Sequence, residues 1–204
     1  AFYECYGIDG MRALDATVDY IRSKYPEIFL IADAKRGDIG NTAKMYAKAF
    51  FEEMDFDAVT IAPYMGADSV TPFLEYKDKW AIVLALTSNA SAYQFQNAQK
   101  DGKPLYQAVM EEMMEISTPD NMMFVVGATK ADKLEELRSF CPDNFFLVPG
   151  VGAQGGSAEE VIAHGANDHG GLLINSSRGI LFADSTEDFA YVAGKVAART
   201  ANLQ

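Results

Sequence analysis

Two acids and a lysine lie close together in the sequence at Asp33, Lys35 and Asp38, directly after the apolar segment 28–32. Side chains alternate between the two faces of a strand, so Asp33 and Lys35 are predicted to point to the same side. A carboxylate beside an ammonium group favours its charged form. Such a pair could hold a charged lysine at a functional site, or it could be only a solvated salt bridge. The apolar strand directly before the cluster favours the functional interpretation.

A second group of residues has the features of an anion site. The glycine-rich segment 150–156 leads into a helix predicted from Ser157, and backbone N–H groups in such a place can bind an anion. Arg178 follows the next predicted strand, directly after Ser177, and its guanidinium can add a bidentate contact to an anion. Phosphate sites in barrels commonly lie on the loops after the last two strands. The alternative is that these glycines only turn the chain.

Residues 150–155 also match the pattern G-x-G-x-x-G, which is typical of dinucleotide-binding folds. That fingerprint belongs to the first strand-to-helix turn of a repeated unit, whereas only one strand is predicted after it here. The dinucleotide interpretation is therefore the weaker one.

Short apolar segments alternate with amphipathic helices along the chain. Strands are predicted at 28–32, 58–62, 81–86, 122–126, 145–148 and 172–175. Helices are predicted at 11–24, 43–50, 70–76, 105–116, 131–140, 157–164 and 189–196. Nearly continuous apolar strands that alternate with helices indicate a parallel sheet covered on both faces.

Polar residues follow almost every predicted strand, which favours a barrel over an open sheet, where ligand groups gather at one switch point. A full barrel has eight strands and about 250 residues, whereas six strands are predicted here and the chain begins with a helix. We therefore expect an α/β fold of the (β/α)8 TIM barrel type that is incomplete, with its first two strands missing. Residues 1–204 are expected to form a single phosphate-binding barrel domain.

Composition excludes several classes of function. The chain has 204 residues with 29 acidic and 17 basic side chains, a net charge of −12 that argues against binding to a nucleic-acid backbone. Its purely apolar stretches are far shorter than the roughly 20 residues that span a bilayer, and the N-terminus lacks signal-peptide features. Two cysteines, Cys5 and Cys141, suit a reducing compartment, so a cytoplasmic location is expected.

The pattern Asp33-x-Lys35-x-x-Asp38-Ile39-x-x-Thr42, at the end of a predicted barrel strand, resembles the signature of the orotidine 5′-phosphate decarboxylase family. Residues 1–7 and 33–42 are similar to the bacterial branch of that family. The resemblance implies a (β/α)8 barrel, a homodimer with shared active sites, and conversion of orotidine monophosphate to uridine monophosphate and CO2 in pyrimidine biosynthesis. It also implies that neither a metal nor a cofactor takes part.

The resemblance assigns roles to individual residues. Asp33 would lie against the substrate carboxylate, and Lys35 would protonate C6. Three residues would reach across the dimer interface into the partner's site, namely Asp38, Ile39 and Thr42. The substrate-binding residues would be Ser88 at the pyrimidine, Gln154 between base and phosphate, and Pro149, Ser177 and Arg178 around the phosphate.

Two departures from the family pattern stand out. The family uses another lysine on the preceding barrel strand, and this sequence has no lysine before Lys24, so that lysine is expected upstream of Ala1. Segment 88–91 also lacks a Pro-Gly pair after the serine. Two alternatives stay open: a metal-dependent sugar-phosphate decarboxylase or aldolase of a related barrel, and a phosphate-binding barrel without catalysis.

Overall fold

The computed structural model describes residues 1–127, 131–150 and 157–201. The chain divides into two compact units. The first unit comprises Ala1–Leu84 with Glu111–Met122, and the second comprises Ala85–Met110 with Met123–Gln204. That residues 1–204 form a single domain stays a prediction.

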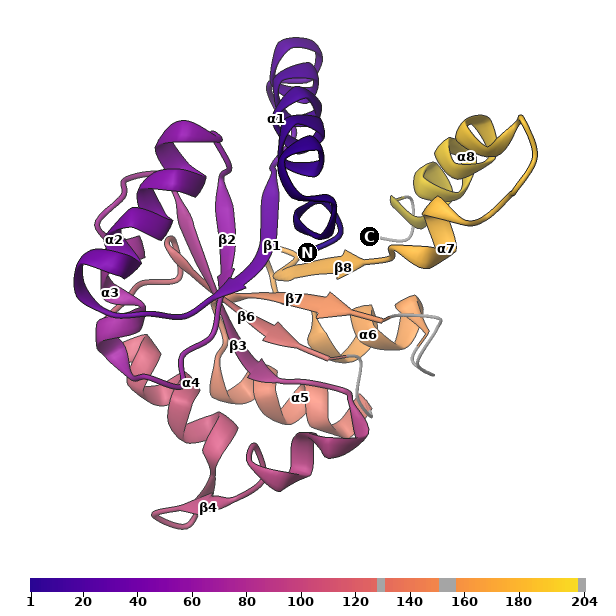
Figure 1. The fold of residues 1–204 in the computed structure, drawn as a ribbon. Helices are drawn as coiled ribbons and strands as arrows, with labels where there is room; N and C mark the ends of the chain where they lie inside the picture. Colours follow the sequence, from indigo (N-terminus) through magenta and orange to yellow (C-terminus); the bar gives the residue numbers. More distant parts are fainter. Residues whose placement is uncertain (128–130, 151–156, 202–204) are drawn as a thin grey trace. The chain divides into compact units, whose positions relative to one another are not determined.

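Six strands make up the main sheet (Figure 1). They are β1 (Ile31–Arg36), β2 (Ala58–Ile61), β3 (Trp80–Leu86), β6 (Met122–Val126), β7 (Phe145–Pro149) and β8 (Leu172–Asn175). Their order in the sheet, β1-β2-β3-β6-β7-β8, is the order of the chain, and the pairs β1–β2, β2–β3, β6–β7 and β7–β8 are parallel. A doubly wound dinucleotide sheet reverses its order at a switch point, so this topology argues against that alternative.

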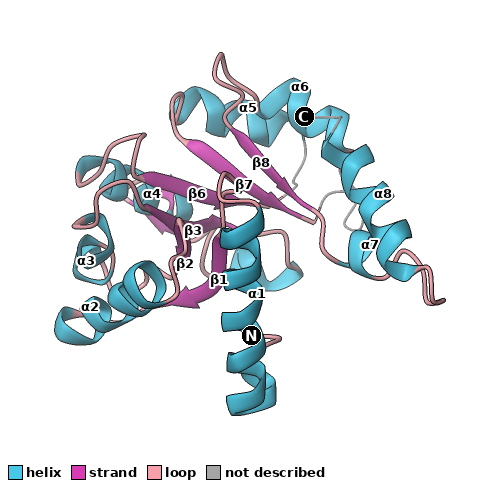
Figure 2. Cartoon of the chain, turned by 90° about the horizontal axis from the view of Figure 1, so that it is seen from above, coloured by secondary structure: helices cyan, strands magenta, loops and turns pink. Residues whose placement is uncertain are grey.

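Helices alternate with the strands along the chain (Figure 2). The α-helices are α1 (Gly7–Lys24), α2 (Gly40–Lys48), α3 (Thr71–Leu74), α4 (Leu105–Glu115), α5 (Ala131–Phe140), α6 (Ala158–Gly165), α7 (Arg178–Leu181) and α8 (Phe189–Ala201). Short helical turns cover Glu4–Tyr6, Ala49–Glu53, Ala67–Ser69 and Ala90–Gln94, and β4 (Gln99–Lys100) pairs with β5 (Lys103–Pro104) in a small hairpin. The predicted alternation of strands and helices is confirmed, whereas the short α7 was not predicted.

Each unit has its own apolar core, built on a strand that is buried along its whole length. In the first unit every residue of β2 is buried, and Phe73 of α3 packs edge-on against Phe51. In the second unit residues 123–126 of β6 are buried, next to the fully buried Phe146 of β7. Strands buried on both faces need apolar residues at nearly every position, which is why the sequence pattern identified them.

The predicted position of the first strand was wrong by several residues. The sequence predicted 28–32, whereas β1 spans Ile31–Arg36, and both Ile28 and Phe29 are exposed. β1 is defined by its pairing with β2, in which Ile31 faces Ala58 and Arg36 faces Ile61. Backbone pairing does not require apolar side chains, so charged residues extend the strand beyond its apolar part. Asp33 and Lys35 therefore lie within β1 and not after it.

Among the described residues, no helix combines the length and the apolar character that a membrane span requires.

Candidate active site

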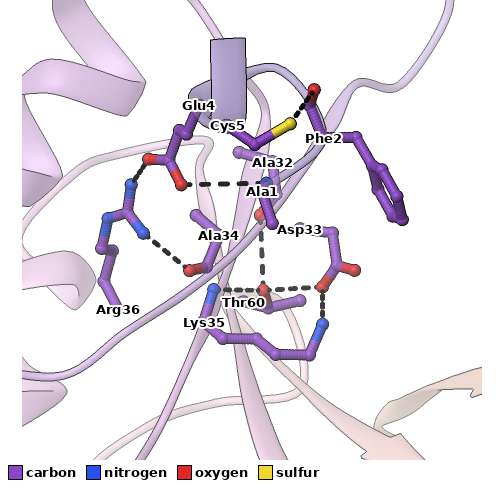
Figure 3. A network of polar contacts seen from close by, with 10 residues as sticks. All are labelled: Ala1, Phe2, Glu4, Cys5, Ala32, Asp33, Ala34, Lys35, Arg36 and Thr60. Atoms are coloured by element: carbon purple, nitrogen blue, oxygen red, sulfur yellow. Dashed lines mark hydrogen bonds and ion pairs between the residues drawn. The ribbon is translucent and has the colours of Figure 1, made fainter. Parts of the chain in front are cut away.

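Asp33 and Lys35 of β1 form an ion pair between the Lys35 ammonium and Oδ1 of Asp33 (Figure 3). Both side chains remain accessible, with 50% of Lys35 and 61% of Asp33 exposed. The prediction that these two side chains lie together is confirmed. A cation and a carboxylate that are exposed to solvent on β1 are available to a ligand.

The backbone at Lys35 departs from regular strand geometry. Its φ of 48° lies in the left-handed region, and the register of β1 against β2 shifts between Ala32 and Arg36. Bulges of this kind re-aim side chains and are common beside active sites. The simple two-residue alternation assumed from the sequence therefore does not by itself account for the pair.

Thr60 of β2 links the two members of the pair. Its side chain is fully buried, its Oγ1 accepts a hydrogen bond from the Lys35 N–H at 2.9 Å, and its hydroxyl donates to Asp33 Oδ1 at 3.0 Å. Sequence reasoning missed this residue. The available signal was a single polar side chain within the apolar run of residues 58–62.

Arg36, the last residue of β1, makes a second set of contacts that hold the strand. Its guanidinium forms an ion pair with Glu4, and its Nη1 donates to the Ala34 carbonyl at 2.9 Å. The same guanidinium lies 5.5 Å from the ring centre of Tyr46 and 5.4 Å from that of Phe50. Arg36 thus ties β1 to the turn at Glu4–Tyr6 and to the helical segment 40–53. Sequence reasoning did not identify this contact either.

Asp38 does not contact the Asp33–Lys35 ion pair among the hydrogen bonds and ion pairs of the described residues. Its Oδ1 accepts a hydrogen bond from the Ile39 N–H at 2.8 Å. Within the described part of the chain, no hydrogen bond or ion pair joins Asp38 to Lys35. Ile39 and Thr42 are exposed, at the start of α2 and in its first turn. The structure therefore leaves these three residues on an accessible surface of the first unit.

The two predicted phosphate loops begin at neighbouring strand ends in the second unit. Pro149 of β7 is in register with Asn175 of β8, and the exposed Ser177 and Arg178 follow at the start of α7. Gln154 lies outside the described residues. The shared starting point of the two loops is the arrangement that the sequence predicts.

The amino end of α6 is capped by its own residues. The helix begins at Ala158, and Ser157 caps it, with the Glu160 N–H donating to Ser157 Oγ at 3.1 Å. Glu159 and Glu160 supply negative charge in the first turn, which already complements the positive end of the helix dipole. That segment 150–156 binds an anion stays a prediction, because residues 151–156 lie outside the described part of the chain.

Ser88 follows β3 and lies against Gly127, the residue after β6. The Gly127 N–H donates to the Leu86 carbonyl at 2.7 Å. A Cβ added to Gly127 would lie 2.7 Å from the Ser88 nitrogen and 2.9 Å from its Cβ, which is too close for any side chain. Glycine at position 127 therefore allows the loop that carries Ser88 to approach the end of β6.

No group of three or more histidine, cysteine or acidic side chains suited to a metal ion occurs among the residues that the structure describes.

Parallel strands in chain order, with charged and polar residues at their carboxyl ends, define an α/β protein of the barrel class. The chain belongs to the orotidine 5′-phosphate decarboxylase / HUMPS family, whose model matches residues 1–190. The family predicted from the sequence is thus confirmed.

Individual relatives agree with this assignment. Proteins named orotidine 5′-phosphate decarboxylase from Christiangramia forsetii and Bacteroides fragilis are 56% and 53% identical over 95% and 100% of the chain. The matches cover 71% and 74% of those two proteins. That two further strands and a lysine precede Ala1 stays a prediction.

Solved structures show the same fold. The structure of the Leishmania donovani OMP decarboxylase superimposes with a TM-score of 0.84 at 35% sequence identity. The match covers 99% of the present chain and 78% of the Leishmania chain. A structure from Toxoplasma gondii titled as a putative orotidine-monophosphate decarboxylase matches 99% of the chain and 76% of its own, with a TM-score of 0.84 at 36% identity. The α/β barrel fold class is thereby confirmed.

Proposed function

We propose that this protein converts orotidine monophosphate to uridine monophosphate and CO2, a step of pyrimidine biosynthesis. The observation that carries the proposal is the Asp33–Lys35 ion pair on β1, in a chain whose relatives bear the name of this enzyme. The reaction uses no metal or cofactor, and the enzyme works in the cytoplasm. The free thiols of Cys5 and Cys141 support a reducing compartment.

Lys35 stabilises the charge that the reaction develops. When the bond between C6 and the carboxylate breaks, the electron pair stays on C6 in an sp² orbital that no π system can drain. The Lys35 ammonium lies beside this carbon, stabilises the carbanion and then transfers its proton to C6. Because Thr60 and Arg36 hold the strand in advance, little reorientation accompanies the charge development, which is the basis of electrostatic catalysis. Asp33 faces the substrate carboxylate and holds the ammonium in place.

We infer that the remaining residues named by the family resemblance bind the rest of the substrate. Ser88 would contact the pyrimidine, and Gln154, which is outside the described residues, would act between the base and the phosphate. Arg178 binds the phosphate, with Pro149 and Ser177 in the loops around it. The exposed guanidinium of Arg178 beside the ends of β7 and β8 supports this assignment. Binding of a group remote from C6 supplies energy for positioning the reacting base.

The enzyme acts as a homodimer with shared active sites. Asp38, Ile39 and Thr42 reach into the partner's site, where Asp38 lies near the ribose and the lysine. Support comes from exposed apolar side chains on this surface, since Ile39 is 49% and Met45 is 59% exposed. Sedimentation measurements on the wild type and on an Ile39→Glu variant test this part, and a monomeric wild type would exclude it.

Replacement of Lys35 by alanine tests the proposal. Lys48→Ala is the matched control, because Lys48 is also paired with a carboxylate, Glu53, and is 46% exposed compared with 50% for Lys35. Turnover is followed by the loss of orotidine monophosphate absorbance, and folding by circular dichroism. Lys35→Ala is expected to lower kcat by about 10³-fold or more, whereas Lys48→Ala keeps it.

Two results would overturn the proposal. One is a folded Lys35→Ala variant that retains a large part of the wild-type turnover. The other is wild-type turnover that disappears on treatment with a chelator and returns with Mg²⁺, which is the behaviour of the metal-dependent alternative.

A further inference from the structure

We propose that Thr60 is a positioning residue for the reaction, because its buried hydroxyl holds the Lys35 backbone and the Asp33 carboxylate at the same time. The inference rests on the proposed function. It assigns to β2 a part of the site that the motif on β1 does not contain.

The hydroxyl of Thr60 is a polar group in an otherwise apolar, buried strand, so its hydrogen bonds must account for its presence there. The other three residues of β2 are Ala58, Val59 and Ile61, all fully buried, and Thr60 itself has no exposed surface. A buried hydroxyl without a hydrogen bond costs free energy, and a valine would fill the same volume without that cost. The best contacts of this hydroxyl are to Lys35 and Asp33.

The two hydrogen bonds fit the chemistry of a hydroxyl, which has one proton to donate and lone pairs to accept. Oγ1 accepts from the Lys35 N–H at 2.9 Å, so its own proton is free to bind Asp33 Oδ1 at 3.0 Å. The Ala32 carbonyl is a longer alternative acceptor at 3.5 Å. Asp33 Oδ1 is also the atom that the Lys35 ammonium contacts (Figure 3). A closed ring therefore runs from the Lys35 backbone through Thr60 and Asp33 to the Lys35 side chain.

Lys35 needs such support because its backbone is in an unfavourable conformation. Four non-glycine residues among those described have positive φ, and the other three are aspartates, Asp55, Asp78 and Asp101. Aspartate tolerates the left-handed region through its short polar side chain, whereas lysine rarely adopts it. Strained residues of this kind persist where the surroundings determine them and are common at active sites.

The Thr60 hydroxyl takes the place of a ladder acceptor. The register shift between Ala32 and Arg36 interrupts the regular pairing with β2 at Lys35, and the Lys35 N–H bonds to the side chain of Thr60. Without the hydroxyl, the Lys35 N–H loses its hydrogen-bond acceptor and Asp33 Oδ1 loses a donor. Neither the Lys35 backbone nor the carboxylate that contacts its ammonium is then held in place by Thr60. A misplacement of about 1 Å can cost on the order of 10²-fold in rate.

Three variants separate positioning from a general structural effect. Thr60→Val keeps the shape and removes the hydroxyl, and Thr60→Ser keeps the hydroxyl. The matched control is Ser69→Ala, which removes another fully buried hydroxyl of the first unit, one that donates to the Gly66 carbonyl at 2.7 Å. Thr60→Val is expected to lower kcat by about 10- to 100-fold with KM nearly unchanged. Thr60→Ser restores kcat, and Ser69→Ala leaves it at the wild-type value.

Hydrogen exchange of the Lys35 amide, measured by ¹H–¹⁵N NMR, gives a second readout that does not require turnover. Exchange is expected to be slow in the wild type and in Thr60→Ser, and faster in Thr60→Val. If Thr60→Val does not fold, Thr60→Ala serves in its place, since it also removes the hydroxyl.

The outcomes distinguish this inference from the proposed function. If the wild type does not decarboxylate orotidine monophosphate, the proposed function fails, and the Lys35 amide still reports on Thr60. An unchanged kcat in the folded variant without the hydroxyl, or a loss that serine does not restore, overturns the inference. Equal amide protection in Thr60→Val and the wild type overturns it as well.

Discussion

Replacement of Arg138 by alanine is expected to destabilise the second unit strongly while leaving the chemistry of the site intact. Arg138 lies in α5 and is 9% exposed. Its guanidinium donates five hydrogen bonds to backbone carbonyls, those of Gly165, Cys141, Pro142, Asn144 and Gly171, at distances from 2.7 to 3.1 Å. It also stacks over the Phe146 ring at 4.0 Å.

The size of the effect follows from these contacts. Four of the five hydrogen bonds are buried, and only the one to Pro142 is partly accessible. At about 1 kcal/mol each they contribute about 4 kcal/mol, which agrees with the roughly 3–5 kcal/mol lost when one partner of a buried charged contact is removed. Burial lowers the pKa of Arg138, because the charged form loses hydration. This free-energy cost of desolvation makes the net contribution of Arg138 to stability smaller than the sum of its hydrogen-bond energies.

Thermal unfolding and urea titration measure the loss. For a chain of this size, a loss of about 3–5 kcal/mol lowers Tm by about 6–20 °C. Arg138→Lys should lose about half as much, because an ammonium keeps the charge but not the planar fork of donors. The exposed Arg199 in the last turn of α8 provides the control, and Arg199→Ala should leave Tm unchanged.

The contacts of Arg138 also predict what does not change. Asn144 precedes β7 and Gly171 precedes β8, so Arg138 holds the amino ends of these strands, whereas the proposed phosphate loops follow Pro149 and Asn175 at their carboxyl ends. Well below Tm, kcat and KM of Arg138→Ala should therefore equal the wild-type values. A Tm within about 2 °C of the wild type would refute the estimate from buried hydrogen bonds.

Two further substitutions and one labelling experiment have definite expected outcomes. Gly127→Ala forces a Cβ to within 2.7 Å of the Ser88 nitrogen, so it should destabilise the fold by about 1–3 kcal/mol in urea titrations, and equal stability would contradict the close approach. Arg178→Ala should raise KM for orotidine monophosphate by about 10- to 100-fold with a smaller effect on kcat, whereas an unchanged KM would place the phosphate elsewhere. At pH 8, Ellman's reagent should react quickly with the exposed Cys5 and only after unfolding with the buried Cys141, and two fast thiols per chain would contradict that burial.

The thiol prediction extends to the pH dependence of stability. Burial raises the pKa of Cys141 from 9.0 to about 11, so the fold favours the protonated thiol. This contribution is fully present below about pH 9 and is lost as the pH rises toward 11, because the unfolded chain gives up the proton first. Between these values the wild type should lose more unfolding free energy than a Cys141→Ala variant, and parallel curves would exclude the effect.

Much of the fold could be predicted from the sequence because its strands are buried on both faces. β6 is an unbroken apolar segment and β2 is apolar except for Thr60, and the positions of both strands were predicted to within one residue. The same rule failed for β1, where a register shift and charged residues extend the strand past Ala32. Apolar periodicity reports burial, and it carries no information on a strand that continues through its backbone hydrogen bonds alone.

The site was predictable only where its residues are neighbours in sequence. Asp33 and Lys35 stand two positions apart, so their proximity could be inferred. The contacts of Thr60 with these residues span 25 and 27 positions, and the ion pair of Arg36 with Glu4 spans 32. Contacts of this length depend on tertiary packing, and a single sequence does not reveal them.

The structure also explains why a site of this kind on β1 requires the neighbouring strand β2. A lysine with φ of 48° is held at a cost of about 1–2 kcal/mol relative to an ordinary strand conformation. Arg36 fixes the Ala34 carbonyl and Thr60 fixes the Lys35 N–H, so the backbone is held immediately before and at the strained residue. These contacts offset the strain and keep the ammonium of an exposed side chain against one carboxylate oxygen. The conformation that places Lys35 beside Asp33 is therefore a property of β1 and β2 together, and the charged motif on β1 cannot produce it alone.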